Sequence, residues 1–383
     1  ADLTGATINM RVTGDTFIDE GDEFIFADAA SLTSDATRAT DNSALLAFDV
    51  EQRGNTLVAI AAQGDATEVL DQLEGGSTEN TQQVGQAINQ LTEELGAGDI
   101  DPSSELGEMV TELQAVSEEE FVAAVESLQP EATGSTSGAT SADNAAASTI
   151  NNRQASLRAP IMSGLAAGDE ASAINGVWGQ LYDSNTDQDT IDDVDGFDAD
   201  TYGIAVGFDM PLNENTNIGM AFSYANTDMD SKGAEGNSME IDSFRLTGYG
   251  SYNAEDYYLD AQVSYARNQY DGKRHLFNGL VATNDHDGDQ YSVRLRGGYP
   301  MAFDNGIYFT PKASLEYTYL SEDKYDEKGA GNAGLNVDVK DVEALVAGIG
   351  GEISYAFSTD NYTLIPEFHM MVQHDFIGDE VEV

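Results

Sequence analysis

The second half of the chain alternates large apolar residues with small or polar ones. In the segment TYGIAVGFDM at 201–210, every even position is large and apolar, whereas every odd position is small or polar. Successive side chains of a β-strand point to opposite faces, so this alternation predicts a strand with two unlike faces. Similar alternation recurs at 218–224, 257–265, 291–296 and 307–316.

The connections between these predicted strands alternate in length. Short turns at 211–215, 253–256, 303–306 and 358–361 separate longer acidic connections at 183–196, 227–238, 271–288 and 321–338. In an up-and-down meander, this order places the short turns at one end and the long loops at the other. Outer-membrane barrels have this layout. We therefore predict a mainly β fold, a transmembrane antiparallel up-and-down β-barrel with about nine strands after residue 175, although single-chain bacterial barrels have an even number.

Charged residues within the predicted strands fall on the face opposite the large apolar residues. A barrel in lipid turns its apolar face outward and its polar face to the lumen, whereas a soluble sandwich buries its apolar face in a core. Segments of about ten residues are long enough to cross a bilayer, and the alternating loops favour the barrel. We predict that these charged residues face the lumen: Arg245, Asp260, Arg294, Arg296, Lys312, Glu316, Glu352 and Glu367.

Aromatic residues lie near the ends of the predicted strands. Trp and Tyr are enriched where a membrane meets water, because their rings are apolar and their tips are polar. Outer-membrane barrels carry such girdles at both interfaces, so this placement supports lipid on the apolar side. The predicted interface aromatics are Trp178, Tyr182, Tyr202, Tyr224, Tyr252, Tyr299, Tyr319 and Tyr355.

The first part of the chain has a different pattern. Residues 1–62 contain β-like segments joined at glycines, which predicts a small β module. The period then becomes helical, and Ser117 with Glu120 predicts a capping box. Residues 133–148 are rich in Gly, Ser, Thr and Ala, which predicts a linker that completes a helical region at 63–140. A slim helix at 145–158 is expected within 141–174, ahead of the barrel at 175–383.

Composition narrows the possible functions. The 383 residues include 69 acidic and 16 basic ones, and the formal charge of −53 argues against nucleic acid as a partner. The absence of Cys excludes thiolate metal sites and thiol catalysis. The acidic stretches around Asp187 and around Asp285, Asp287 and Asp289 lack the distal Glu of a calcium loop. We therefore expect no metal, no cofactor and, in the absence of catalytic motifs, no enzyme.

Several segments together resemble the translocator region of type V autotransporters. They are GVWGQLY at 176–182, TYGIAVGFD at 201–209, NIGMAFSYANTD at 217–228 and IDSFRLTGYGSY at 241–252, with LQPEA at 128–132 and NNRQASLR at 151–158 before them. The resemblance implies a barrel of about twelve strands in the outer membrane of a Gram-negative bacterium. It also implies a helix through the pore and an exported passenger. On this basis, the chain is expected to lack its last strands, its signal peptide and most of its passenger.

The resemblance gives the earlier segments expected roles. Residues 1–62 correspond to the C-terminal end of a passenger β-helix, with an autochaperone-like role, and 145–158 to the pore helix. Arg153 and Arg158 of this helix are expected to pair with lumenal carboxylates. Some family members cleave themselves at an Asn pair in the pore helix, which makes Asn151 and Asn152 weak candidates for such a site. The implied partners are outer-membrane lipid and lipopolysaccharide, the barrel assembly machinery and the passenger.

Three functions remain open from the residues. The implied one is an outer-membrane translocator that anchors its own N-terminal passenger and exports or displays it on the cell surface. A porin-like channel is the first alternative, and steady conductance through the lumen would distinguish it. A soluble acidic β-rich adhesin is the second alternative, and it would partition into water without detergent.

Overall fold

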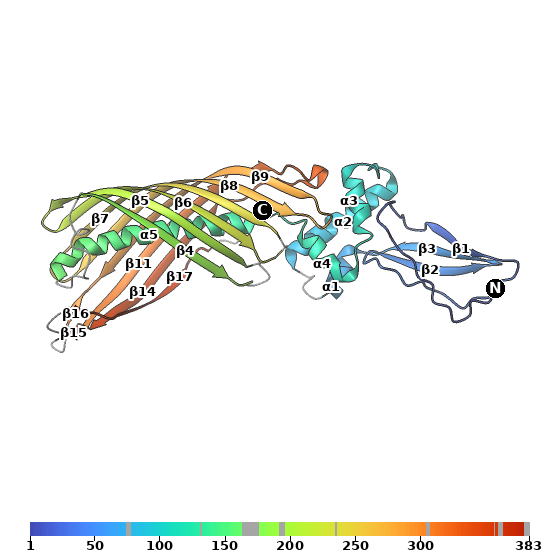
Figure 1. The fold of residues 1–383 in the computed structure, drawn as a ribbon, viewed down its shortest axis with the longest axis horizontal. Helices are drawn as coiled ribbons and strands as arrows, with labels where there is room; N and C mark the ends of the chain where they lie inside the picture. Colours follow the sequence, from blue (N-terminus) through green and yellow to red (C-terminus); the bar gives the residue numbers. More distant parts are fainter. Residues whose placement is uncertain are drawn as a thin grey trace.

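The molecule is elongated, with a small β module, a group of short helices and a large curled sheet arranged in line (Figure 1). The computed structural model describes residues 1–73, 78–130, 132–162, 176–190, 196–233, 236–303, 307–355, 357–358 and 363–378. A long helix, α5 (Ala132–Met162), lies along the concave side of the sheet. Among the helices described, none combines the length and the apolar character that a membrane-spanning helix needs.

The large sheet is an antiparallel meander in which each main strand pairs with its neighbour in the chain. Its main path contains nine strands within the described residues, as the sequence predicts, and the mainly β up-and-down fold is confirmed. The nine strands are β4 (Val177–Gln188), β5 (Phe197–Asn213), β6 (Thr216–Ser231), β7 (Ser238–Asn253), β8 (Tyr258–His275), β9 (Val281–Gly298), β11 (Ile307–Glu322), β14 (Val342–Tyr355) and β17 (Glu367–Asp375).

The first and last strands of this path do not pair with each other within the described residues. The sheet is therefore a half-barrel that curls around α5. Short two-residue strands complete the β structure: β10 (Met301–Ala302), β12 (Tyr325–Asp326), β13 (Asn336–Val337), β15 (Phe357–Ser358) and β16 (Thr363–Leu364). We call the end with the connections 276–280 and 323–341 the loop end, and the end with the connections 214–215 and 254–257 the turn end.

Several strands are longer than the sequence predicts, and their long connections are correspondingly shorter. β8 continues to His275 and β9 begins at Val281, so most of the predicted loop at 271–288 is strand. Pairs such as Asp271 with Asp285 extend the ladder. The ladder satisfies backbone groups that a loop would leave to water. The acidic residues that suggested loops instead occupy strands that project past the apolar band.

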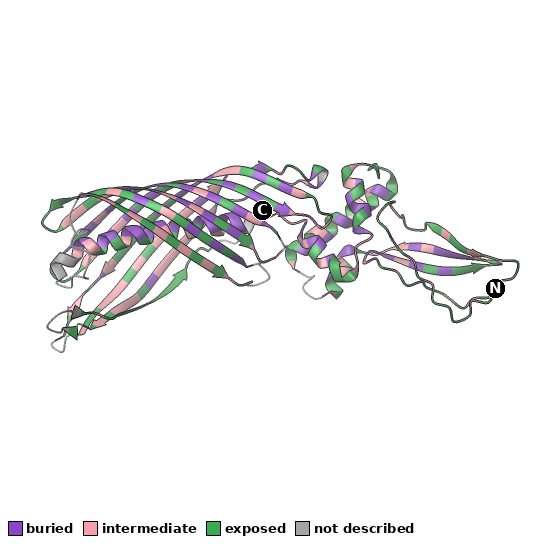
Figure 2. Ribbon diagram, in the orientation of Figure 1, coloured by how far each residue is buried: buried purple, intermediate pink, exposed green. Residues whose placement is uncertain are grey.

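Burial alternates along the central strands, and it is visible as stripes in Figure 2. Small or polar residues of these strands are buried against α5, whereas large apolar residues of the same strands are exposed on the convex side. A soluble sandwich would show the reverse, because its apolar face forms the core. The face with small and polar residues therefore meets α5, and the face with large apolar residues points away from it.

Helix α5 begins well before the predicted start of the slim helix. The predicted linker at 133–148 is helical, so this prediction is wrong, and the predicted boundary at 140 falls inside the helix. Small side chains suit a narrow space: a Cβ on Gly138 would lie 2.4 Å from Ile241 Cδ1, and Ala139 is fully buried. The composition that looks like a flexible linker in water is the composition that fits inside the sheet.

Four helices, three of them short, lie between α5 and the β module: α1 (Ala66–Gln72), α2 (Glu79–Ala97), α3 (Glu105–Leu113) and α4 (Glu118–Glu126). Asp65 caps α1, and Thr78 with Thr81 forms a capping box on α2. The predicted box at Ser117 and Glu120 is wrong, because Ser117 Oγ donates to Glu120 Oε2 at 3.0 Å and makes no bond to the helix backbone.

The N-terminal β module contains β1 (Glu23–Asp28), β2 (Leu46–Arg53) and β3 (Thr56–Gln63), paired in the order β1, β3, β2. Two parallel bridges, Asp2 to Thr33 and Asn9 to Thr40, stack the first residues on a later stretch of chain. Phe48, Leu57 and their neighbours form its core.

Candidate functional site

The candidate site is the concave face of the sheet, which holds α5. Residues directly opposite each other on paired strands share a face, and the register places the charged residues predicted for the lumen on this face. Arg245, Asp260 and Arg294 are buried, whereas Arg296 and Glu367 are exposed. The remaining three form ion pairs there: Glu316 with Arg294, and Lys312 with Glu352.

Arg153 of α5 makes a two-point ion pair with Asp209 of β5. The Nε–Oδ2 distance is 2.7 Å and the Nη2–Oδ1 distance is 3.0 Å, and the side chain of Asp209 is 0% exposed. Tyr249 Oη donates to the same carboxylate at 3.0 Å, and the backbone N–H of Gly176 donates at 3.2 Å. Trp178 Nε1 in turn donates to Tyr249 Oη at 2.8 Å. The buried carboxylate is thus both charge-balanced and hydrogen-bonded, as burial of a charge requires.

A second contact lies nearer the turn end. Arg158 Nη1 lies 2.7 and 2.6 Å from the two carboxylate oxygens of Asp260, and its guanidinium carbon lies 3.9 Å from the centroid of the Tyr258 ring. Between the two arginines, Gln154 Nε2 donates to the carbonyl of Gly250 at 2.9 Å. Both arginines therefore have lumenal carboxylate partners.

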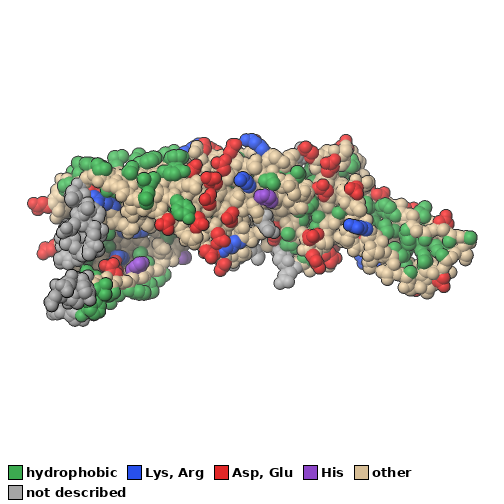
Figure 3. Space-filling model, in the orientation of Figure 1, with side chains coloured by type: hydrophobic (Ala, Val, Ile, Leu, Met, Phe, Trp, Pro, Cys, Tyr) green, Lys and Arg blue, Asp and Glu red, His purple; other side chains and the backbone are tan. Residues whose placement is uncertain are grey.

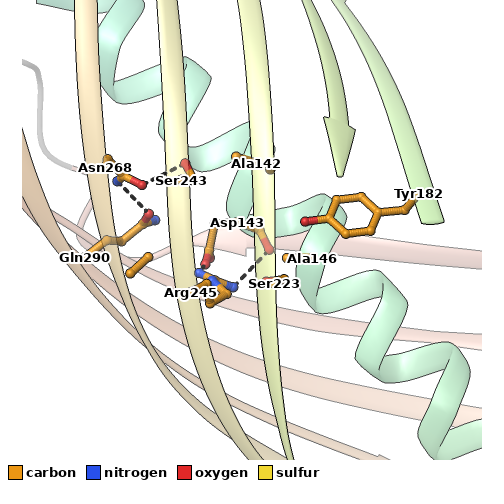
Figure 4. A pocket seen from close by; sticks show the side chains of 11 residues that line it. Ala142, Asp143, Ala146, Tyr182, Ser223, Ser243, Arg245, Asn268 and Gln290 are labelled. Atoms are coloured by element: carbon orange, nitrogen blue, oxygen red, sulfur yellow. Dashed lines mark hydrogen bonds and ion pairs between the residues drawn. The ribbon is translucent and has the colours of Figure 1, made fainter. Parts of the chain in front are cut away.

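A third contact lies closer to the loop end and involves a residue that the sequence did not single out. Asp143 of α5 is buried and pairs with Arg245 and Arg294, and it accepts from Ser292 Oγ at 3.1 and 3.2 Å. Figure 4 shows Asp143 and Arg245 pointing toward each other in a small pocket that Tyr182 also lines. The sequence offers one signal for Asp143, its position among Ala and Ser residues, because a lone acid on a helix of small residues needs a partner once it is buried.

The three contacts together determine one orientation of α5. The helix carries an acid at Asp143 and bases at Arg153 and Arg158, whereas the sheet presents bases near the acid and acids near the bases. Ten residues of α-helix span about 15 Å, so the charges are too far apart to exchange partners. A reversed or shifted helix would place like charges together.

Trp178 and Tyr182 lie on the concave face, so their predicted place at the membrane interface is wrong. The Trp178 ring lies over Gly207, where a Cβ would be 2.5 Å away, and the Tyr182 ring lies over Gly203, where a Cβ would be 2.2 Å away. Glycine on the neighbouring strand gives each ring room beside the helix. The alternation along β4 indicates this placement, because Trp178 and Tyr182 lie two residues on either side of the polar Gln180 and therefore on the same face.

The predicted cleavage site and calcium stretches have ordinary polar contacts. Asn151 Oδ1 accepts from Gln262 Nε2 at 2.7 Å, and Asn152 is exposed on α5. Self-cleavage at this pair stays a prediction. Arg267 pairs with Asp287 at 2.8 Å and with Asp289 at 2.9 Å, Lys328 pairs with Asp285, and Lys232 pairs with Asp187. Among the residues that the structure describes, no cluster has the composition of a metal site.

A family model for the autotransporter β-domain matches residues 177–383. This chain belongs to the autotransporter β-domain family. The family is one of non-enzymatic outer-membrane translocators for a passenger. The autotransporter β-domain of this chain therefore belongs in the outer membrane of a Gram-negative bacterium.

Several named proteins are similar to this chain in sequence. Outer membrane protein A of Rickettsia conorii is 26% identical over 234 residues, which are 58% of this chain and 11% of that protein. Outer membrane protein B of Rickettsia rickettsii is 28% identical over 233 residues, 57% of this chain and 14% of that protein. An extracellular serine protease of Serratia marcescens is 26% identical over 207 residues, 53% and 19% respectively. The chain thus spans less than a fifth of these relatives.

Two solved structures of autotransporter domains are similar to this chain. The translocator domain of the autotransporter NalP from Neisseria meningitidis has a TM-score of 0.48 and 19% identity, and it covers 63% of this chain and 82% of its own. The β-domain of the Bordetella autotransporter BrkA has a TM-score of 0.42 and 19% identity, covering 53% and 81%.

The convex face of this autotransporter β-domain suits lipid. Exposed apolar side chains cover it, and Figure 3 shows them gathered over the barrel, with acidic residues concentrated toward the stem, our name for residues 1–130. Tyrosines form a row across β8, β9 and β11, with ring centroids 5.2 Å apart for Tyr265 and Tyr291, and 6.3 Å for Tyr291 and Tyr319. Tyr319 Oη donates to Asp341 at 2.6 Å, so the polar tips point toward water.

The other predicted interface aromatics lie on the same side. Cross-strand register places Tyr202 and Tyr224 on the convex face toward the loop end, and Tyr252 and Tyr355 toward the turn end. Tyr299, which follows β9, is exposed. Six of the aromatic positions thus remain candidates for interfacial girdles.

Proposed function

We propose that this chain anchors its own N-terminal passenger in the outer membrane and exports and displays it on the cell surface. The observation that carries the proposal is the course of α5. This helix occupies the concave face of the β-domain, is paired with it at three places, and has its N-terminal end at the loop end, next to the stem. This course is the one expected after export, when the chain runs through the lumen from the β-domain in the membrane to the stem outside the cell.

The domain roles follow from this proposal. Residues 1–62 serve as the C-terminal end of a passenger β-helix with an autochaperone-like role, and the parallel bridges at Asp2 and Asn9 support this role. Helices α1–α4 connect it to α5, which acts as the pore helix, and the β-domain follows from 175.

The proposed partners are lipid, lipopolysaccharide, the assembly machinery and the passenger. The apolar convex face supports contact with lipid. The carboxylates on the projecting ends of β8 and β9 support the proposed contact with lipopolysaccharide, through divalent ions around its head groups. Insertion of such a sheet into a membrane requires assembly machinery, because its backbone must be paired before it meets lipid.

Two measurements test the proposal. In intact cells, external protease is expected to remove epitopes placed in residues 1–62 while the β-domain stays protected. In planar bilayers, the native protein is expected to conduct little, and removal of 132–162 should open a steady conductance. Steady conductance with α5 present would favour the porin-like alternative, and protease-resistant stem epitopes in intact cells would contradict display. The intact mass of the extracted protein shows whether the chain is cut at Asn151 or Asn152.

A further inference from the structure

The loop end of the β-domain is packed against the stem helices. One hydrophobic cluster combines Leu95, Met109 and Val110 of the helices with Leu276 and Ala330 of the sheet connections. All five are buried. Because one core is built from both parts, the helices are not a free tether above the barrel.

A buried ion pair lies beside this cluster. Arg274, at the end of β8, is 1% exposed in its side chain, as is its partner Glu327. Arg274 Nε donates to Glu327 Oε1 at 3.0 Å, and Arg274 Nη2 donates to the carbonyl of Ala333 at 3.1 Å. A third bond runs from Arg274 Nη1 to the carbonyl of Ser127, at the C-terminus of α4.

The contact at Ser127 completes a helix end. The last carbonyls of a helix have no partner within it, and a cation there also opposes the helix dipole. Arg274 supplies a hydrogen-bond donor to the carbonyl and a positive charge at the helix end. The backbone N–H of Phe277 donates to Ser127 Oγ at 3.0 Å. Arg274 of the β-domain therefore caps a helix of the stem, and Phe277 holds the side chain of the same Ser127.

The sequence of the stem explains why the cation comes from the β-domain. Residues 54–152 contain 18 acidic residues and no Lys or Arg, and none of α1–α4 has a basic residue in its last turn. Asn278 adds a further polar contact, since its Nδ2 donates to Glu112 Oε2 at 2.8 Å. The β-domain thus supplies a guanidinium and an amide donor to an acidic stem.

We propose that the connections at 274–283 and 325–337 form a docking surface on which α2–α4 fold as a cap over the loop end of the lumen. The partner of this surface is the acidic helical module of the same chain. The docking stands on the contacts alone, whereas the placement of the cap outside the cell rests on the proposed function. Contacts with the β-domain stabilise the packing of the cap.

Hydrogen exchange of the full chain, folded in detergent, tests the docking. Arg274→Ala is expected to lower amide protection in α4 on the order of 100-fold, because it leaves Glu327 buried and unpaired. The matched control is Arg267→Ala, on the same strand, whose pairs with Asp287 and Asp289 are partly exposed and lie away from the stem. Heat-modifiable migration on gels reports whether the β-domain is folded.

Unchanged protection of α2–α4 in Arg274→Ala with a folded β-domain would overturn the proposal. If Arg274→Ala prevents folding of the β-domain, Leu276→Ser supplies the test, since it weakens the shared core without leaving a buried charge. Loss of protection in α3 and α4 is then the expected result, and full protection overturns the docking. Surface display is a separate readout, so a failure of export remains distinguishable from a failure of docking.

Discussion

Charged side chains in the lumen are stabilised by partners rather than by water. Asp209 illustrates the requirement, because its carboxylate receives Arg153, Tyr249 and a backbone N–H in a site without solvent. Replacing a whole buried pair with apolar groups is often tolerated, whereas removing one member leaves the other charged and unpaired. The pairs therefore act as constraints on position.

Asp209→Ala is predicted to destabilise the folded β-domain by about 3–5 kcal/mol, because Arg153 would remain buried without its partner. Urea unfolding followed by the emission of Trp178, the single Trp in the chain, measures this loss. Trp178 is hydrogen-bonded within the same network, so its emission should also shift to the red in the native state. The control is Asp228→Ala on the neighbouring strand, where the side chain is exposed. Equal urea midpoints for the two variants would contradict the prediction.

Helix α5 shows how an element depends on its surroundings. The sequence predicts the strands of the β-domain well, because alternation is a local signal and reports both faces at once. It predicts a linker at 133–148 because Gly, Ser, Thr and Ala have no large side chain to anchor a helix in water. Burial inside the sheet supplies what the local sequence lacks, and no local pattern reports a neighbour that lies 100 residues away.

Candidate residues were predictable to a similar extent. The parity of the strands identifies the lumenal charges, and the family resemblance implies that Arg153 and Arg158 meet carboxylates. The alternation along β4 indicates the concave face for Trp178 and Tyr182, but their position near strand ends led to the prediction of an interfacial place. Asp143 and Arg274 had no local pattern around them, because their importance arises from contacts that only the fold creates.

Insertion of one alanine between Ala146 and Ala147 is predicted to break the match between α5 and the sheet. The insertion rotates the following helix by about 100° and moves it about 1.5 Å, so Arg153 and Arg158 would lose Asp209 and Asp260 while Asp143 keeps its partners. Expected results are a raised conductance in planar bilayers and a red-shifted Trp178 emission. Ser148→Ala, at an exposed position of the same helix, is the control. If the insertion variant keeps a low conductance and an unchanged Trp178 emission, the ion pairs do not determine the register of α5.

The start of α1 is predicted to be sensitive to acid. Hydrogen bonds from Thr67 and Asn89 hold the pKa of Asp65 below its usual value. The stabilisation is therefore complete above the unfolded pKa near 3.8 and is lost as pH falls through the lower folded value. Asp65→Ala is expected to cost about 1 kcal/mol at neutral pH, as for other helix caps. Chemical denaturation followed by circular dichroism should show the difference from wild type shrinking toward low pH.

Glu93→Ala is the control for this prediction, because Glu93 is exposed in the C-terminal part of α2. A difference between wild type and Asp65→Ala that stays constant from neutral to strongly acidic pH would contradict the role assigned to the ionised carboxylate.

At the scale of the whole molecule, charge is distributed unevenly. The stem is strongly acidic, whereas the buried charges of the lumen are paired with opposite charges. Repulsion among exposed charges is screened by salt, and buried pairs are screened much less. The two parts of the molecule should therefore respond differently to ionic strength.

Raising salt from about 10 mM to about 1 M shortens the Debye length from about 30 Å to about 3 Å. The stem is predicted to melt several degrees higher at the upper value, as its helical signal in circular dichroism reports. The emission of Trp178 in the lumen should not change. Destabilisation of the stem by salt would contradict the prediction and would point to ion pairs as its main support.

The length of the strands has one more consequence. β8 contains 18 residues, and at about 3.3 Å per residue and a tilt of about 40° it reaches about 45 Å along the membrane normal. The apolar band of such a barrel is only about 25 Å tall. The strands therefore hold the acidic stem roughly 20 Å from the apolar band of the membrane. This distance exceeds the Debye length of about 8 Å at physiological salt, so repulsion between the stem and anionic head groups is largely screened.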